Sequence, residues 1–295
     1  MIRPARFGAN PETAASNRFQ QGGATPDAPL AARREFEGLA SQLADAGVAV
    51  HAADDSPEPA KPDACFPNNW VTFHDDGSVV LYPLLAASRR AERREEPIAL
   101  LRSAGFRIAR TIDLSHWEER GEYLEGTGSL VLDRCHHIAY ACWSPRTTPA
   151  AVADFAARFG YRVVRFDSHG PGGQAIYHTN VMMAIGERFA VVCPDAIPDP
   201  QQQAALLRTL EQSGHEPIAI SITQMNGFAG NLLALKSQQG EPLIAMSAAA
   251  WDCLGPQEHH GLERHGRIVT APIPTIEHHG GGSVRCMIAE VFLPR

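Results

Sequence analysis

The chain has 295 residues, 44% of them hydrophobic and 20% charged, and a formal net charge of −7. This length can bury a sizeable core, whereas an acidic chain without a basic run has no electrostatic footprint for a nucleic-acid partner. No run of 18 apolar residues occurs, so neither a membrane-spanning helix nor a membrane partner is expected.

The first predicted elements precede any visible repeat. Residues 1–7 are expected to form a strand, residues 29–46 a helix and residues 48–52 another strand. The stretch 53–64 is rich in Pro and Asp, which is typical of a plain surface connector.

Five later segments share one pattern, a short polar or Gly-rich stretch followed by a β-branched or apolar strand. They recur at intervals of 51 to 59 residues, marked by Trp70, Ser129, Asn180, Asn231 and Val284. Such self-similarity is the sequence signature of a repeat architecture. We therefore predict similar structural units rather than two unrelated domains.

The first four units continue alike. A turn and a second apolar strand follow the first strand, which is a hairpin signal. A helix comes next, at residues 88–103, 149–159, 199–213 and 256–264. Pro149 and Pro256 suit a first helical turn, and Gly105, Gly160 and Gly214 suit a C-terminal cap. A single strand closes each unit, at residues 107–109, 161–164, 216–220 and 267–269.

The fifth unit is split between the two ends of the chain. Its first strand is predicted at residues 284–293, and its partners are the strand 1–7, the helix 29–46 and the strand 48–52. Closing the first unit onto the last leaves no exposed sheet edge. The expected fold is one α/β domain, residues 1–295, built from five ββαβ units around an axis.

Equivalent positions of such a ring gather near its axis, which predicts where a site lies. The polar stretches supply Asn68, Asn69, Glu125, Thr127, His178, Asn180, Asn231, Ser283 and Cys286. A thiol, an imidazole and a carboxylate from three units are the groups that nucleophilic catalysis needs. Each has a plainer alternative: Cys286 as a small buried hydrophobe, His178 as a core histidine and Glu125 as a loop acid.

Metal and phosphate sites are poorly supported. The pairs His136-His137, His259-His260 and His278-His279 are adjacent, and neighbouring side chains of a strand point to opposite faces. The glycines at residues 170–173 lack the Lys-Ser/Thr of a phosphate-binding loop. We therefore expect no metal site and no cofactor.

The six cysteines are scattered without a C-x-x-C pair, and the start of the chain leads into no apolar signal region. Reduced thiols and a cytoplasmic location are the expectation from this pattern. The sequence leaves open whether the chain forms a homodimer.

Several of these residues together resemble the signatures of a known superfamily. They are Glu125-Gly126, His178-Thr179-Asn180 and the run from Gly280 to Met287. The chain is similar in these motifs to the guanidino-group-modifying enzymes of the pentein fold. Its N-terminus and the motif Phe66-Pro67-Asn68-Asn69-Trp70 resemble the amidinotransferase-like branch, which includes citrulline-utilisation hydrolases. The resemblance implies a five-bladed pseudo-symmetric α/β propeller.

The resemblance also implies roles for individual residues. Cys286 would attack the central carbon of a guanidino or ureido group, His178 would act as general acid and base, and Glu125 would orient the site. A resonance-deactivated carbon asks for a soft nucleophile, and the leaving amine must be protonated. Substrate-binding candidates are Asn68, Asn69, Thr127, Asn180, Asn231 and Arg285.

Two positions depart from the arginine-acting pattern, because deiminases have Asp where this chain has Asn69 and Asn180. The expected function is a cofactor-free cysteine hydrolase of an arginine-like amino acid, with citrulline preferred. Alternatives are an arginine deiminase, a dimethylarginine hydrolase, an amidinotransferase and a non-enzymatic pentein binding protein. Arg285 is a candidate for the substrate α-carboxylate, although it should point away from Cys286 on a regular strand.

Overall fold

The computed structural model describes residues 1–23 and 25–295 and contains four three-stranded sheets with one topology. Within each sheet the first two strands are antiparallel, and the second and third are parallel. The strands are β3 Val71–Phe73, β4 Ser78–Leu81, β5 Arg110–Asp113, β6 Val131–Asp133, β7 Ile138–Cys142, β8 Arg162–Phe166, β9 Met183–Ile185, β10 Phe189–Val192, β11 Glu216–Ala219, β12 Leu233–Lys236, β13 Pro242–Ser247 and β14 Arg267–Ala271.

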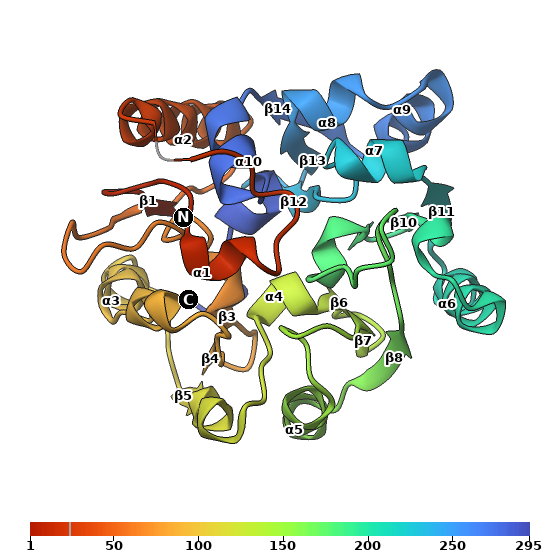
Figure 1. The fold of residues 1–295 in the computed structure, drawn as a ribbon, viewed down its shortest axis with the longest axis horizontal. Coiled ribbons are helices and arrows are strands. Elements are labelled where there is room, and N and C mark those ends of the chain that lie inside the picture. The colour runs from red at the N-terminus through yellow and green to blue at the C-terminus, as the bar shows by residue number, and fades with distance from the viewer. Residues whose placement is uncertain (24) are drawn as a thin grey trace.

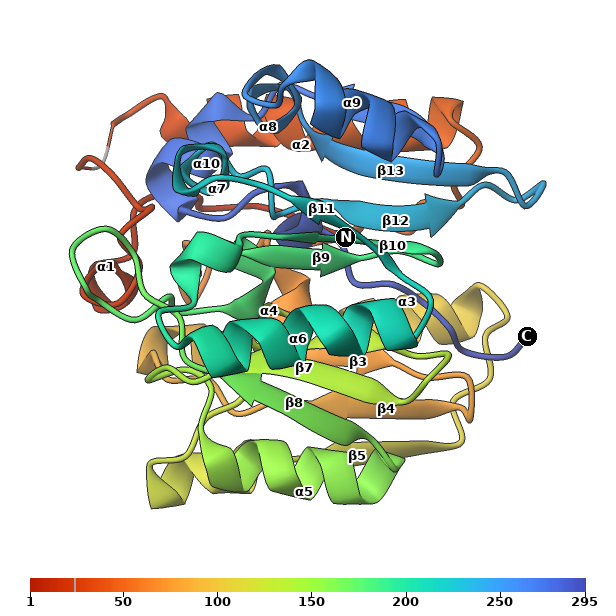
Figure 2. The same cartoon turned by 90° about the vertical axis from the view of Figure 1, so that its right-hand side faces the viewer.

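A helix joins each parallel pair, as a crossover connection requires. These helices are α3 Glu96–Ser103, α5 Pro149–Phe159, α6 Pro200–Gln212 and α9 Pro256–Glu263. They lie at the periphery of the molecule, outside the strands (Figure 1). Figure 2 shows α5 and α6 running along the outer side of their sheets. The repeated ββαβ order predicted from the sequence is therefore confirmed for the first four units.

Two of these helices show why their bounds were predictable. Helix α5 begins at Pro149 and ends before Gly160, whose φ of 68° is left-handed, as predicted. Helix α6 is capped by Asp199, whose side chain accepts a hydrogen bond from the Gln201 N–H. The predicted helix 88–103 is instead divided into a 3₁₀ segment, Ala87–Glu92, and α3.

Two predicted closing strands are shifted along the chain. The strand predicted at 107–109 is β5, because pairing with β4 starts where Ser78 faces Arg110. Residues 107–109 precede this strand, and the Ala109 N–H donates a hydrogen bond to the Gly77 carbonyl in the turn between β3 and β4. The strand predicted at 48–52 is β2 Ala53–Asp54, which pairs in parallel with β1 Ile2–Arg3.

The fifth unit is only partly as predicted. Helix α2 Ala28–Asp45 joins β1 and β2, and both termini lie close to this unit (Figure 1). The strand predicted at 284–293 is wrong: it begins as the 3₁₀ turn Val284–Met287, and its later part makes a single parallel bridge from Val291 to Phe73. The described sheets are small, and none of them closes on itself, so they establish a mixed α/β fold.

The remaining helices are short: α1 Pro11–Ala14, α4 Gly126–Ser129, α7 Ile222–Asn226, α8 Ala248–Asp252 and α10 Pro274–Gly280. No helix among residues 1–23 and 25–295 is long and apolar enough to cross a membrane.

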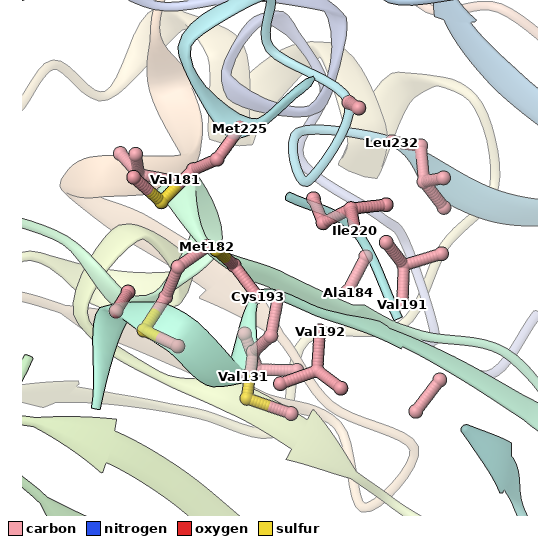
Figure 3. Packing of buried hydrophobic residues seen from close by; sticks show 14 of the residues in the cluster. Val131, Val181, Met182, Ala184, Val191, Val192, Cys193, Ile220, Met225 and Leu232 are labelled. Atoms are coloured by element: carbon pink, nitrogen blue, oxygen red, sulfur yellow. The ribbon is translucent and has the colours of Figure 1, made fainter. Parts of the chain in front are cut away.

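The largest hydrophobic cluster ties neighbouring units together. Figure 3 shows Val131 of the second unit against Met182 and Val192 of the third, with Met225 and Leu232 of the fourth nearby. Because burial of such side chains is worth about 1.5–3 kcal/mol each, the units hold one another in place. Polar turns that precede the first strands are thereby fixed relative to one another.

These polar stretches form single helical turns, although the sequence predicted that they lead directly into strands. Helix α4 contacts both 3₁₀ turns Pro67–Asn69 and Thr179–Val181, and Pro67–Asn69 contacts Val284–Met287. Backbones meet closely: a Cβ on Gly126, which has a φ of 48°, would lie 2.2 Å from the Asn68 carbonyl oxygen. Only glycine permits that approach. Short turns from different units thus converge in the middle of the molecule (Figure 1).

Candidate active site

Cys286 lies in the 3₁₀ turn Val284–Met287 and is 4% exposed. Its sulfur accepts hydrogen bonds from two carboxamides, Asn180 Nδ2 at 3.4 Å and Asn231 Nδ2 at 3.3 Å. Asn231 Nδ2 also donates to the Asn180 carbonyl at 3.0 Å, which fixes its orientation. Two N–H donors therefore point at one sulfur. Three units therefore meet at the thiol, as the repeat predicted.

His178 and Glu125 form a second contact between units. His178 Nε2 lies 2.8 Å from Glu125 Oε2, and both residues are buried. The other carboxylate oxygen accepts from the Leu85 N–H at 3.1 Å. Arg146 Nη1 at 3.4 Å and Arg89 Nη1 at 3.8 Å also face Oε2. These contacts fix the Glu125 carboxylate, and its hydrogen bond with His178 orients the imidazole.

Burial and charge act in opposite directions on this pair. Burial would raise the pKa of Glu125, but the Arg146 charge and the hydrogen bond with His178 outweigh it and lower that pKa. Burial lowers the pKa of His178 from its usual value, and the Glu125 carboxylate opposes this only in part. A carboxylate beside a neutral imidazole is therefore the resting arrangement. Such an imidazole can accept a proton and later return it.

Cys286 and His178 line one small cavity, with room for about one water molecule. Asn69 and three buried charged residues, Asp63, Arg89 and Arg146, also line its wall. Arg89 is held by Glu92 through two hydrogen bonds, of 2.9 and 2.8 Å. Both signs of charge are therefore present within one enclosed space.

Asn69 has an orientation that its neighbour dictates. Arg89 Nη1 donates to Asn69 Oδ1 at 2.9 Å, and a guanidinium can only donate. The Nδ2 group must therefore point the other way, where it is buried without a hydrogen-bond partner in the described chain. It lies against Gly128, where a Cβ would come within 2.4 Å of it and within 2.8 Å of His178 Nδ1. Asn69 thus presents a free N–H donor near the imidazole.

An N-terminal segment, residues 10–21, covers this cavity. Asn17 Nδ2 donates to the Gly281 carbonyl at 3.3 Å. Arg146 Nη2 donates to the Thr13 carbonyl at 3.1 Å and to Ser16 Oγ at 2.7 Å. Arg146 therefore contacts both the covering segment and Glu125.

The other predicted binding residues lie elsewhere. Arg285 points away from the thiol: its guanidinium donates to the Ile288 carbonyl at 3.0 Å and pairs with Glu290 at 3.1 Å. It lines a separate cleft of about 1160 Å³, as does Thr127. Asn68 is buried, with neither side-chain atom hydrogen-bonded to the described residues. Arg285 therefore does not face the cavity that Cys286 and His178 line, in agreement with the direction expected for it.

Sequence reasoning missed Asp63, Arg89 and Arg146. Asp63 lies in the stretch interpreted as a plain connector, but that stretch folds around buried Lys61, whose ammonium donates to the Ser56 carbonyl at 2.9 Å. Arg89 is one of several arginines in residues 89–94, so nothing in the sequence marks it. A better signal existed for Arg146, which follows β7 at the end where the polar turns gather.

Comparison with models of protein families shows which family the chain belongs to. The family model for N,N dimethylarginine dimethylhydrolase, eukaryotic, matches residues 3–293. The chain belongs to this family. As a member of the dimethylarginine dimethylhydrolase family it lies in the guanidino-modifying pentein superfamily and is a hydrolase of carbon–nitrogen bonds. A comparison with curated protein sequences finds no match.

Solved structures of similar fold cover the whole of this family member. An apo structure of ArgZ, an arginine dihydrolase from the ornithine–ammonia cycle in cyanobacteria, has a TM-score of 0.76 at 17% identity. The match covers 100% of this chain but only 40% of full-length ArgZ. The N-terminal domain of a single-residue ArgZ variant, covalently bound to a reaction intermediate, matches over 100% and 98% of the two chains, with a TM-score of 0.74 at 18% identity.

A dimethylarginine dimethylaminohydrolase adduct with 4-chloro-2-hydroxymethylpyridine is also similar, with a TM-score of 0.64 at 14% identity over 97% of this chain and 96% of that one. At these identities the likeness concerns the fold, which is that of pentein hydrolases.

Proposed function

We propose that the protein hydrolyses the ureido group of citrulline to ornithine, CO2 and ammonia, with Cys286 as nucleophile. The contact that supports this most directly is the thiol held between Asn180 and Asn231 in a cavity that also exposes His178. Glu125 orients His178 through its 2.8 Å hydrogen bond. No cofactor enters these steps.

The proposed chemistry needs one thiol and one imidazole. His178 takes the Cys286 proton, the sulfur adds to the ureido carbon, and the proton passes to the departing nitrogen, which leaves as ammonia. His178 then takes a proton from water, whose oxygen adds to the same carbon and expels the sulfur. The N-carboxylated ornithine that is released loses CO2. Citrulline and one water thus give ornithine, CO2 and ammonia.

The charged cavity wall fits the other end of an amino acid. Arg89 and Arg146 are cations that suit an α-carboxylate, and Asp63 is an anion that suits an α-ammonium group. Each of these groups also has a protein partner, since Arg89 pairs with Glu92 and Asp63, and Arg146 pairs with Glu125. We therefore propose an α-amino acid as the substrate class.

Asn69 favours a ureido group over a guanidinium. Its orientation leaves an unpaired N–H donor near His178, and a ureido carbonyl oxygen can accept from it. A guanidinium has only donors and would leave the Asn69 donor unpaired. Asn180 and Asn231 are outside the lining of this cavity, and their part in the proposal is to hold the Cys286 sulfur.

A second candidate is an arginine dihydrolase, in which the same thiol first removes ammonia from arginine to give citrulline. The similarity in fold to ArgZ over the whole chain favours it. Hydrolysis of dimethylarginine, as the family name describes, is a third possibility within this chemistry.

The experiment is an end-point assay of the purified protein with citrulline, arginine or asymmetric dimethylarginine, each supplied separately. Ornithine, citrulline, ammonia and dimethylamine are measured, with Cys286→Ala as the matched control. We expect equal amounts of ornithine and ammonia from citrulline. Accumulation of citrulline from arginine, or release of dimethylamine, with citrulline left intact would overturn the proposed substrate.

We also propose that residues 1–295 form one catalytic domain in which the five units close into a five-bladed ring. Four sheets of equal topology and the bridge from Val291 to Phe73 support this closure. A cytoplasmic location, favoured by six free cysteines, and a homodimeric state complete the proposal.

A further inference from the structure

A second cluster of ligating side chains lies where the second and third units meet. Asp133 and His136 lie at the turn between β6 and β7, and His215 precedes β11. One ligand atom from each lies within 4.8 Å of the others. His136 Nδ1 is 2.8 Å and His215 Nδ1 is 3.9 Å from Asp133 Oδ2. The active-site cavity is lined by other residues.

The carboxylate in this cluster lacks an ordinary counterion. Asp133 is 4% exposed, and within the described ranges its ion-pair partners are His136 and His215 alone, with no Lys or Arg within 4.0 Å. A buried carboxylate that faces two imidazoles is costly unless positive charge is supplied. A divalent cation bound between them would supply it.

A neighbouring hydroxyl points to the same conclusion. Tyr140 is fully buried, and its hydroxyl has no hydrogen-bond partner in the part of the chain that is described. On the paired strands β6 and β7, Tyr140 faces Val131 and Ile138 faces Asp133, so the Tyr140 side chain lies on the same side of the sheet as Asp133. A water on a bound cation would give this hydroxyl its missing partner.

We propose that Asp133, His136 and His215 form a binding site for a divalent transition cation of the Zn²⁺ class, separate from the Cys286 cavity. Two imidazole nitrogens and one carboxylate oxygen are common ligands for such a cation, with a fourth position for water. Asp133 and His215 line the large cleft, so an ion can reach them. The half-exposed ring of His136 can rotate to close the coordination shell.

Sequence reasoning expected no metal site because adjacent histidines of a strand diverge. The structure places His136 in a turn rather than in a strand, and it brings His215 from another unit beside it. A cation held here would join the turn after β6 to the chain before β11. Ligand binding of this kind stabilises the folded state in proportion to the logarithm of its concentration.

The test uses the full chain carrying Cys286→Ser, because the active-site thiol is itself a soft metal ligand. Metal-free protein is titrated with Co²⁺, whose visible absorption reports tetrahedral coordination, and Zn²⁺ is then used to displace it. We expect one equivalent bound and a rise in Tm with Zn²⁺. His136→Ala should weaken binding at least about tenfold, since it removes one of three ligands from an exposed position.

His137→Asn is the matched control, because it removes the adjacent imidazole at a left-handed φ of 51°, which Asn tolerates. This variant should bind Co²⁺ as the Cys286→Ser protein does. His215→Ala serves as a second ligand variant where it folds. Absence of binding, or equal affinity in the His136→Ala and His137→Asn variants, would overturn the proposal.

Discussion

Arg89 Nη1 donates to Asn69 Oδ1 at 2.9 Å, and this one contact decides which end of the Asn69 carboxamide is left unpaired. The free end is an N–H donor, although a carboxylate at this position would offer only acceptors. The proposed preference for a neutral substrate therefore depends on residues 69 and 89 together.

Asn69→Asp and Asn180→Asp, alone and combined, should lower citrulline turnover and improve arginine binding relative to citrulline. The Asn69→Asp variant loses the donor to the ureido oxygen, and the change at Asn180 also places negative charge beside the Cys286 sulfur. We expect at least about a tenfold fall in kcat/KM for citrulline, the scale of a lost buried hydrogen bond. Steady-state kinetics on both substrates measure it.

The control for this prediction is Asn69→Ala, which removes the donor without adding charge. It should lose citrulline activity and gain nothing with arginine. A wild-type preference for arginine, or Asp variants with an unchanged preference, would contradict the argument for a neutral substrate.

Cys286→Ala should lower kcat at least about a thousandfold, which is the scale seen when a nucleophile is removed. The variant should stay folded, since the replaced atom borders a cavity and alanine adds no volume. Circular dichroism melting checks the fold, and the ornithine assay checks the activity. Substantial remaining turnover would remove Cys286 from the mechanism.

Iodoacetamide should modify two thiols with different consequences. Cys135 is exposed and should react without loss of activity, whereas alkylation of Cys286 should inactivate the protein and be slowed by substrate. Cys65 should stay unmodified, because burial and then the charge of Asp63 raise the pKa of its thiol. Peptide mass spectrometry identifies the modified sites, and Cys135→Ser is the control. Inactivation that tracks modification of Cys253 would argue for another thiol.

The pH profile should reflect a His178 that is already neutral at mildly acidic pH. Since burial lowers its pKa, the base form persists below the usual value of about 6.5. As pH falls, kcat/KM should therefore hold through about pH 6 and decline only below it. The Glu125 carboxylate works against the lowering, so Glu125→Gln should move this acidic limb to still lower pH. A limb centred at or above pH 6.5 would contradict this assignment.

His178→Ala should lose hydrolysis yet still form a covalent adduct with an analogue that carries a good leaving group. Such a group departs without a proton from an acid, and at alkaline pH the thiolate forms without the imidazole. Intact-protein mass spectrometry at alkaline pH should show the adduct, with Cys286→Ala as the unreactive control. Absence of an adduct from the His178→Ala protein at that pH would show that His178 does more than move protons.

The helices and the catalytic grouping were accessible from sequence because their signals are local or repeated. Pro149 and Gly160 mark both ends of α5. The repeat brings together the helical turns at which Glu125, His178 and Cys286 lie, although Glu125 and His178 precede their turns and Cys286 lies within its own. The strand predicted around Cys286 was wrong because a single helical turn and a short strand share the same apolar composition.

Other parts of the site depend on contacts between distant segments. Asp63 is buried only because the connector folds around Lys61, and Arg89 differs from Arg90 only in the direction it faces. The partners of both are supplied by tertiary packing, which no spacing in the sequence expresses. His215 joined the Asp133 cluster for the same reason.

The segment 10–21 has a kinetic consequence. The cavity beneath it has room for about one water molecule, so an amino acid as large as citrulline cannot enter while the segment stays in place. Arg146 would have to release Thr13 and Ser16 in each cycle, yet the same guanidinium faces Glu125. Opening the site therefore also loosens the group that orients the imidazole. We therefore expect the site to be inactive while the segment is displaced, so that the return of the segment limits kcat.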